Sequence, residues 1–213
     1  MKETRITFPS GELTLEGLLA KPDKPQAGHA AVVCHPHPLY GGSMYNNVVE
    51  AVLEAMWRFG WATLRFNFRG VGNSTGEHSG GAGEAVDAAA AVNYVIAELG
   101  ADPRQLVLAG YSFGAMAAMT AAPNINDLGA LMLIALPIRM TAADTLRNFT
   151  GSIMLASGDA DSYCPAPQLQ SIATDLGEQA QVRIINGADH FFGGYEEELA
   201  NAIHSMLRAA AKE

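Results

Sequence analysis

The sequence predicts an α/β domain built on a mostly parallel central sheet with helices on both faces. Short apolar segments of strand length, such as residues 30–34, alternate with longer segments whose apolar residues recur at helical spacing, such as residues 46–59. Segments that are apolar throughout are typical of strands buried on both faces, as in a parallel sheet. The 213 residues suit one domain, so we expect residues 1–213 to fold as a unit.

The elements follow one another in a regular order. Apolar runs or polar–apolar alternation predict strands at residues 5–8, 13–20, 30–34, 61–68, 105–109, 130–136, 153–157 and 182–185. Apolar residues that recur every three to four positions predict helices at residues 46–59, 84–99, 165–176 and 196–210, with a shorter helical segment around 142–147. Gly100 closes the second helix, and the glycine-rich residues 79–83 predict a flexible loop between a strand and a helix.

Composition excludes several classes of function. The net charge is −9 and lysines and arginines are scattered, which disfavours a nucleic-acid partner. No apolar run is long enough to span a bilayer, and the N-terminus lacks the apolar core of a signal peptide, so we expect a cytoplasmic protein. Cys34 and Cys164 do not form a disulfide framework. No cofactor is expected, and the sequence is compatible with a monomer or a homodimer.

The most informative motif is a G-x-S-x-G turn at residues 110–114, with Ser112 at its centre. An apolar segment at residues 106–109 precedes it, and small helix-forming residues follow at 115–119. This strand–turn–helix setting is typical of a nucleophile elbow, in which a sharp turn between two glycines exposes the serine hydroxyl. The alternative is a serine that only caps a helix.

An activated serine needs a base and an acid, which follow it in the chain in the order acid, then histidine. The segments expected as the next strands end at Asp161 and His190, where residues of a parallel sheet meet at one edge. We choose Asp161 over Asp159, which we expect to bond the turn backbone. His204 lies inside the last helix and is expected at the surface.

An oxyanion hole requires two backbone N–H donors, and Phe113, the residue after the serine, supplies the first. The second comes from the loop after the strand at 30–34, where prolines have no N–H. This leaves His37, with Leu39 or Tyr40 as alternatives. His35 and His37 form no metal site by this interpretation, because no third ligand is nearby, and His35 is expected to be a hydrogen-bonded structural residue.

The chain resembles the small bacterial α/β-hydrolases that carry an HPHP-x-x-GG loop. The matching stretches span almost the whole chain in order, and they are residues 35–42, 64–74, 110–114, 158–161 with Pro165, and 187–192. The resemblance implies an α/β-hydrolase fold and a triad of Ser112, Asp161 and His190. It departs from the pattern at residues 162–164, where two small apolar residues are expected before the proline.

These residues predict a serine hydrolase that acts on a small-molecule ester. Residues 137–152 are too few for a lid domain, so we expect short-chain, soluble esters. Tyr40 and Phe191 are candidates to line the substrate pocket, with Met140 and Phe149 as a small apolar wall. A peptidase, a lactone hydrolase and a perhydrolase would use the same residues, and a non-catalytic binding protein would not require all three.

Overall fold

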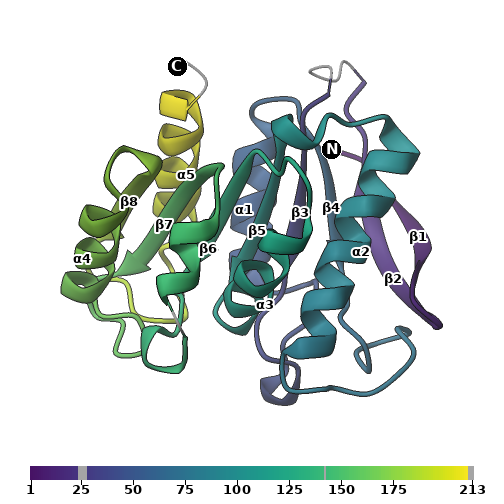
Figure 1. The fold of residues 1–213 in the computed structure, drawn as a ribbon, viewed down its shortest axis with the longest axis horizontal. Coiled ribbons are helices and arrows are strands. Elements are labelled where there is room, and N and C mark those ends of the chain that lie inside the picture. The colour runs from purple at the N-terminus through teal and green to yellow at the C-terminus, as the bar shows by residue number, and fades with distance from the viewer. Residues whose placement is uncertain (24–27, 142, 211–213) are drawn as a thin grey trace.

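The structure, a computed structural model, describes residues 1–23, 28–141 and 143–210 and shows one eight-stranded sheet in the order β1-β2-β4-β3-β5-β6-β7-β8 (Figure 1). The strands are β1 (Glu3–Ser10), β2 (Leu13–Ala20), β3 (Ala30–Cys34), β4 (Ala62–Phe66), β5 (Leu106–Tyr111), β6 (Ala130–Ile134), β7 (Ser152–Gly158) and β8 (Ala180–Ile185). β2 pairs antiparallel with β1 and with β4, and the remaining pairings, which join β4, β3, β5, β6, β7 and β8 in that order, are parallel. The predicted α/β fold is therefore confirmed.

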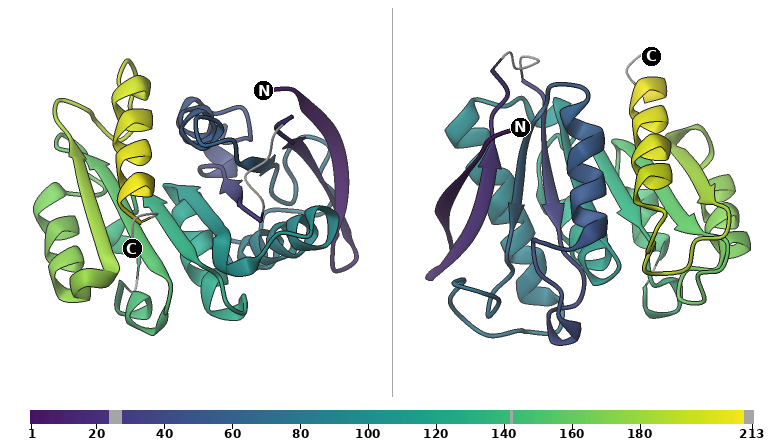
Figure 2. Two further views of the ribbon diagram at one scale, coloured as in Figure 1. Left: turned by 90° about the horizontal axis from the view of Figure 1, so that it is seen from above. Right: turned by 180° about the vertical axis from the view of Figure 1, so that it is seen from behind.

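Helices cover both faces of this sheet, as Figure 2 shows from above. The helices are α1 (Asn47–Trp57), α2 (Ala82–Leu99), α3 (Phe113–Ala121), α4 (Ala166–Leu176) and α5 (Glu196–Ala210). α1 and α5 contribute to one hydrophobic core, and α2, α3 and α4 contribute to the core on the opposite face. Every residue of β3 and β6 is buried, because both of their faces are covered.

Three expectations about surface segments are wrong. The loop expected at residues 79–83 ends earlier, because α2 begins at Ala82, and the buried carboxylate of Glu84 accepts hydrogen bonds from Ser79 N (2.9 Å), Ser79 Oγ (2.9 Å) and Gly81 N (2.7 Å). His204 is half-buried on α5, where its ring stacks on Phe59 at 4.4 Å. Phe149 is buried in the core near the amino end of β7, and therefore forms no wall beside the serine.

The segment between β6 and β7 is short and carries no lid domain in its described part. It contains the 3-10 helices η4 (Ile138–Met140) and η5 (Ala143–Asn148). The helical segment expected at residues 142–147 is thus a 3-10 helix from Ala143 onward, and residue 142 lies outside the described residues. In the described part of the chain, no helix is both long and apolar enough to cross a membrane.

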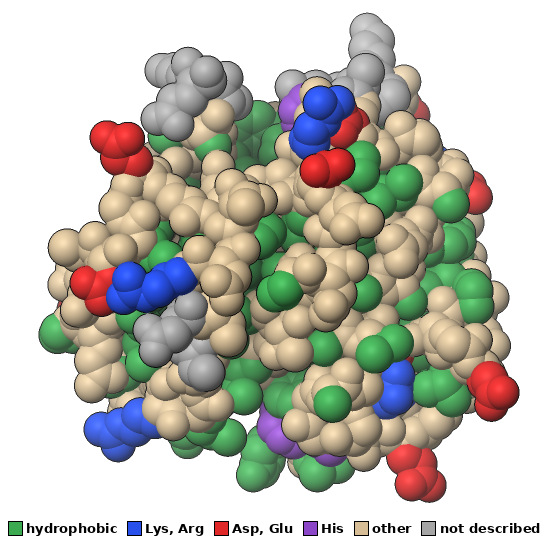
Figure 3. Space-filling view, in the orientation of Figure 1, with side chains coloured by type: hydrophobic (Ala, Val, Ile, Leu, Met, Phe, Trp, Pro, Cys, Tyr) green, Lys and Arg blue, Asp and Glu red, His purple; other side chains and the backbone are tan. Residues whose placement is uncertain are grey.

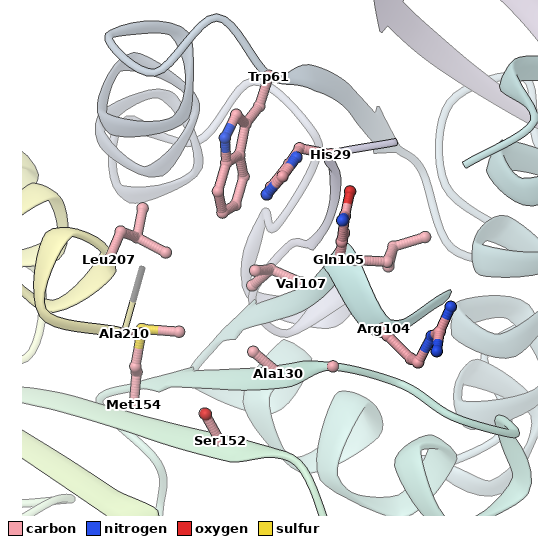
Figure 4. A pocket seen from close by; sticks show the side chains of 12 residues that line it. His29, Trp61, Arg104, Gln105, Val107, Ala130, Ser152, Met154, Leu207 and Ala210 are labelled. Carbon is pink, nitrogen blue, oxygen red and sulfur yellow. The ribbon is translucent and has the colours of Figure 1, made fainter. Parts of the chain in front are cut away.

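A hollow of about 160 Å³ lies at the amino ends of the parallel strands (Figure 4). The first residues of β5, β6 and β7 form its floor, and Trp61 and Leu207 stand at its sides. Ser112 follows the carboxyl end of β5, at the opposite edge of the sheet. The hollow is therefore separate from the candidate site described next.

Candidate active site

Ser112 occupies a strained turn between β5 and α3. Its backbone has φ 53° and ψ −118°, a conformation that residues with a side chain rarely adopt. The Ser112 N–H donates to Ile134 O on β6 at 2.9 Å, and its carbonyl accepts from Ala115 N at 2.9 Å and Met116 N at 3.2 Å. Because bonds on both sides of the residue fix the turn, the strained conformation is maintained and the side chain is held at the sheet edge.

Glycines are required on both sides of the serine, as the motif predicts. A β-carbon at Gly110 would collide with the backbone of Gly114 and Ala115. A β-carbon at Gly114 would collide with the backbone of Cys34 and His35 at the end of β3. The tight turn thus depends on close approach of the backbone both within the turn and to the neighbouring strand.

The structure brings the predicted serine, histidine and aspartate into one hydrogen-bonded chain. Ser112 Oγ lies 2.9 Å from His190 Nε2, and His190 Nδ1 lies 2.8 Å from Asp161 Oδ2. His190 and Asp161 are both buried, and they follow β8 and β7 respectively. An ionised carboxylate only accepts hydrogen bonds, which places the imidazole proton on Nδ1 and leaves Nε2 to accept from the serine hydroxyl.

The carboxylate of Asp161 is stabilised in its ionised form. Its Oδ1 accepts from Tyr163 N at 2.8 Å and Cys164 N at 2.9 Å. Burial opposes ionisation, but the hydrogen bond from His190, the two backbone donors and the charge of the imidazolium outweigh it and hold the pKa of Asp161 below its usual value. The carboxylate is therefore charged at neutral pH, as the partner of a protonated imidazole must be.

The neighbouring carboxylates are engaged elsewhere. Asp159 is exposed and accepts from Gly187 N at 2.7 Å, so it ties the turn after β7 to the turn after β8. This corrects the expectation that Asp159 bonds the backbone of its own turn. Asp189 accepts from Phe191 N at 2.9 Å, so it caps the turn after β8. Neither carboxylate is bonded to the imidazole, which leaves Asp161 as its partner.

Two supporting residues escape sequence reasoning. Tyr111 Oη donates to the His190 carbonyl at 2.9 Å, and burial together with nearby carboxylates raises the pKa of this phenol, so it remains a donor. Ser157 Oγ lies 3.2 Å from Asp161 Oδ2 and 3.0 Å from Cys164 O. The sequence signal for Ser157 is weak, namely one hydroxyl at the end of an apolar strand.

The backbone donors expected around the serine differ in their availability. Phe113 begins α3, where a helix leaves its first N–H groups without an intrahelical acceptor. Leu39 N donates to His37 Nδ1 at 3.2 Å, and Tyr40 N donates to His37 O at 3.1 Å. Both alternatives are thus occupied, and His37 N is the remaining candidate of the three.

The remaining residues expected at the site have distinct surroundings. His35 is fully buried, with Nδ1 2.6 Å from Pro36 O and Nε2 accepting from Phe68 N at 3.1 Å, so it is the structural histidine expected. Tyr40 is 87% exposed, and its ring lies 4.9 Å from that of His37. Burial raises the pKa of the Cys164 thiol to about 12, which keeps it protonated.

Comparison with known proteins agrees with the fold. An uncharacterized protein from Rickettsia prowazekii is 34% identical over an alignment of 216 positions that covers 95% of this chain and 88% of that protein. The structure of an alpha-beta serine hydrolase homologue from Coxiella burnetii has a TM-score of 0.86 at 31% identity, with 97% of each chain covered. A serine hydrolase without lid from Xanthomonas campestris has a TM-score of 0.81 at 28% identity, covering 98% of this chain and 95% of that one.

The comparison with protein families covers most of the chain as well. Residues 30–212 match the family described as alpha/beta hydrolase domain, and they include β3 to β8 and all three residues of the hydrogen-bonded chain. The chain therefore belongs to the alpha/beta hydrolase domain family.

Proposed function

We propose that this hydrolase is a serine carboxylesterase that acts on small, soluble esters. The observation that carries the proposal is the unbroken chain from Ser112 Oγ through His190 to Asp161, with distances of 2.9 and 2.8 Å. The strained turn that presents Ser112 supports it, because such strain is concentrated at functional sites. A non-catalytic binding protein would not need all of these features.

The mechanism follows from the positions of the groups. His190 Nε2 takes the proton from Ser112 as the serine oxygen attacks the ester carbonyl, and the N–H groups of Phe113 and His37 stabilise the oxyanion. His190 then gives that proton to the departing alcohol, and an acyl-enzyme remains. A water molecule, deprotonated by the same imidazole, cleaves the acyl-enzyme, while Asp161 stabilises the imidazolium in both steps.

The preference for short acyl chains follows from the connection between β6 and β7. Two short 3-10 helices occupy the described part of this connection, where a lid would be inserted. Without a lid, a long acyl chain would remain largely in water and would contribute little binding energy. The similar protein from Xanthomonas campestris is likewise a serine hydrolase without lid.

Hydrolysis of p-nitrophenyl acetate, butyrate, octanoate and palmitate by the wild type and Ser112→Ala tests the proposal. We expect turnover of the two short esters, and a fall in kcat of roughly 10⁴- to 10⁶-fold in the variant. A fluorophosphonate probe should label the wild type and not Ser112→Ala. Absence of labelling would point to a binding scaffold, and faster hydrolysis of palmitate than of acetate would refute the short-chain preference.

A further inference from the structure

Exposed hydrophobic side chains gather at the edge of the sheet where Ser112 lies. Of the eight large hydrophobic residues exposed in the described part of the chain, all but Met1 and Val86 lie in loops at the carboxyl edge of the sheet. Figure 3 shows histidine side chains at the lower edge of the molecule, among hydrophobic ones. The six exposed residues of this edge are Leu39, Tyr40, Tyr45, Met140, Tyr163 and Phe191. Such clustering marks this edge as a place where a ligand binds, and the contacts of each side chain show which of the six a ligand meets.

The sheet order divides these residues between two sides of the serine. β3 lies on one side of β5, and β6, β7 and β8 lie on the other (Figure 1). Tyr163 follows β7 and Phe191 follows β8, so both lie on the side of His190. Their rings contact the imidazole, with centroids 4.7 Å from it for Tyr163 and 5.5 Å for Phe191.

Tyr163 is held firmly although its ring is exposed. Its N–H donates to Asp161 Oδ1 at 2.8 Å, and its carbonyl accepts from Ile138 N at 3.2 Å. Tyr163 is 55% exposed, and Phe191 is 63% exposed. Hydrogen bonds thus fix the Tyr163 backbone on both sides of its Cα, while the ring stays open to solvent. Such a side chain is preorganised for a ligand, because little conformational freedom is lost on binding. Tyr163 also stands in the segment that departs from the family pattern.

The chemistry of the proposed function identifies the part of the substrate that lies here. His190 must protonate the departing oxygen, so the alcohol portion of the ester lies beside this imidazole. We propose that the alcohol portion carries an aromatic ring, which the exposed rings of Tyr163 and Phe191 recognise. This inference rests on the proposed function. Of the six exposed hydrophobic residues at this edge, Tyr163 and Phe191 are the two whose rings contact the imidazole.

An aromatic group interacts more favourably with the rings of Tyr163 and Phe191 than an aliphatic group of equal size does. Both would remove similar apolar area from water, but only the aromatic ring gains from stacked or edge-to-face contact with the two rings. The carboxylates of Asp159 and Asp189 lie in the adjoining turns and disfavour an acidic alcohol group by charge repulsion. The ligand class is therefore an ester of a ring-bearing alcohol that carries no negative charge.

A matched pair of esters tests this assignment. Benzyl acetate and cyclohexylmethyl acetate share the acyl group, the size of the ring and a primary alcohol, and they differ in aromaticity. We expect the wild type to prefer benzyl acetate by about 3- to 10-fold in kcat/KM. Tyr163→Leu and Phe191→Leu should move this ratio toward one, whereas Tyr163→Phe should keep it. Tyr45→Leu is the control, because Tyr45 lies against Arg65 on the β3 side, and it should keep the wild-type ratio.

The outcomes separate this inference from the proposed function. A wild-type ratio near one, or a ratio unchanged in the double variant Tyr163→Leu/Phe191→Leu, overturns the inference while labelling of Ser112 still supports the esterase. Failure of labelling overturns both. Methyl phenylacetate and methyl cyclohexylacetate place the ring in the acyl group instead. A Tyr163-dependent preference within that pair, and not within the acetate pair, overturns the assignment to the alcohol.

Discussion

Acid should destabilise this protein through His35 before its carboxylates are protonated. Burial lowers the pKa of His35 from 6.5 to about 4, because a charged imidazole would lose its hydration in the core. The contacts agree, since Phe68 N–H donates to Nε2, which must therefore carry no proton. In the unfolded chain His35 binds a proton near pH 6.5, whereas in the native state it stays neutral down to about pH 4. The free energy of unfolding therefore falls as the pH drops from 6.5 to about 4.

The expected loss is about 3 kcal/mol over the full interval, and about 2 kcal/mol between pH 7 and pH 5. Urea unfolding of the wild type and His35→Gln across this range measures it. Glutamine keeps one donor and one acceptor but does not titrate, so its curve should be flatter by about 2 kcal/mol, whatever its stability at pH 7. Parallel curves with equal m-values would refute the reasoning, because they would mean that native His35 takes up its proton as readily as the unfolded chain does.

Three further predictions concern the turn and its surroundings. Asp161→Asn should lower kcat toward p-nitrophenyl acetate by about 10³- to 10⁴-fold and change KM little, because the amide favours the wrong tautomer of His190. Equal losses in kcat and in substrate affinity would contradict this prediction. Gly114→Ala should lower the free energy of unfolding by about 1–3 kcal/mol, measured in urea, through collision with the end of β3. Glu84→Gln should cost about 1–3 kcal/mol and increase proteolysis within residues 79–83; an unchanged digestion pattern would show that the carboxylate does not hold this loop.

The sequence predicts the interior of the fold closely and its loops less well. The ranges expected for β2, β3 and α5 coincide with the structure, because continuous apolar runs and helical periodicity are local signals. The candidate site residues could be selected from the sequence because they follow strands, and the carboxyl ends of parallel strands share an edge. β5 extends to Tyr111, two residues beyond its predicted end, because pairing with β6 continues as far as Ile134.

What could not be predicted depends on where side chains point. The hydroxyl of Tyr111 meets the carbonyl of His190 across 79 positions of sequence, and no local pattern indicates such a contact. The same holds for Glu84, which sequence periodicity places on a helix face but which folds back on the preceding loop. Contacts of this kind follow from the assembled sheet and from the need of buried polar groups for partners.

Two of the stretches that carry the family resemblance, residues 35–42 and 64–74, lie in the loop after β3 and at the end of β4 with the loop that follows it. Asn67 accepts from Met44 N at 2.9 Å and so joins the loop after β4 to the loop after β3, and His35 joins the same two loops through Phe68 N. The side chains of His35 and Asn67 thus hold the two loops together. His37 N, the candidate second oxyanion donor, is placed by this framework. A substitution at Asn67 should therefore reduce kcat, because it would displace the His37 N–H that is the candidate oxyanion donor. The Asn67 side chain itself bonds to Met44 N and to the Glu16 carboxylate.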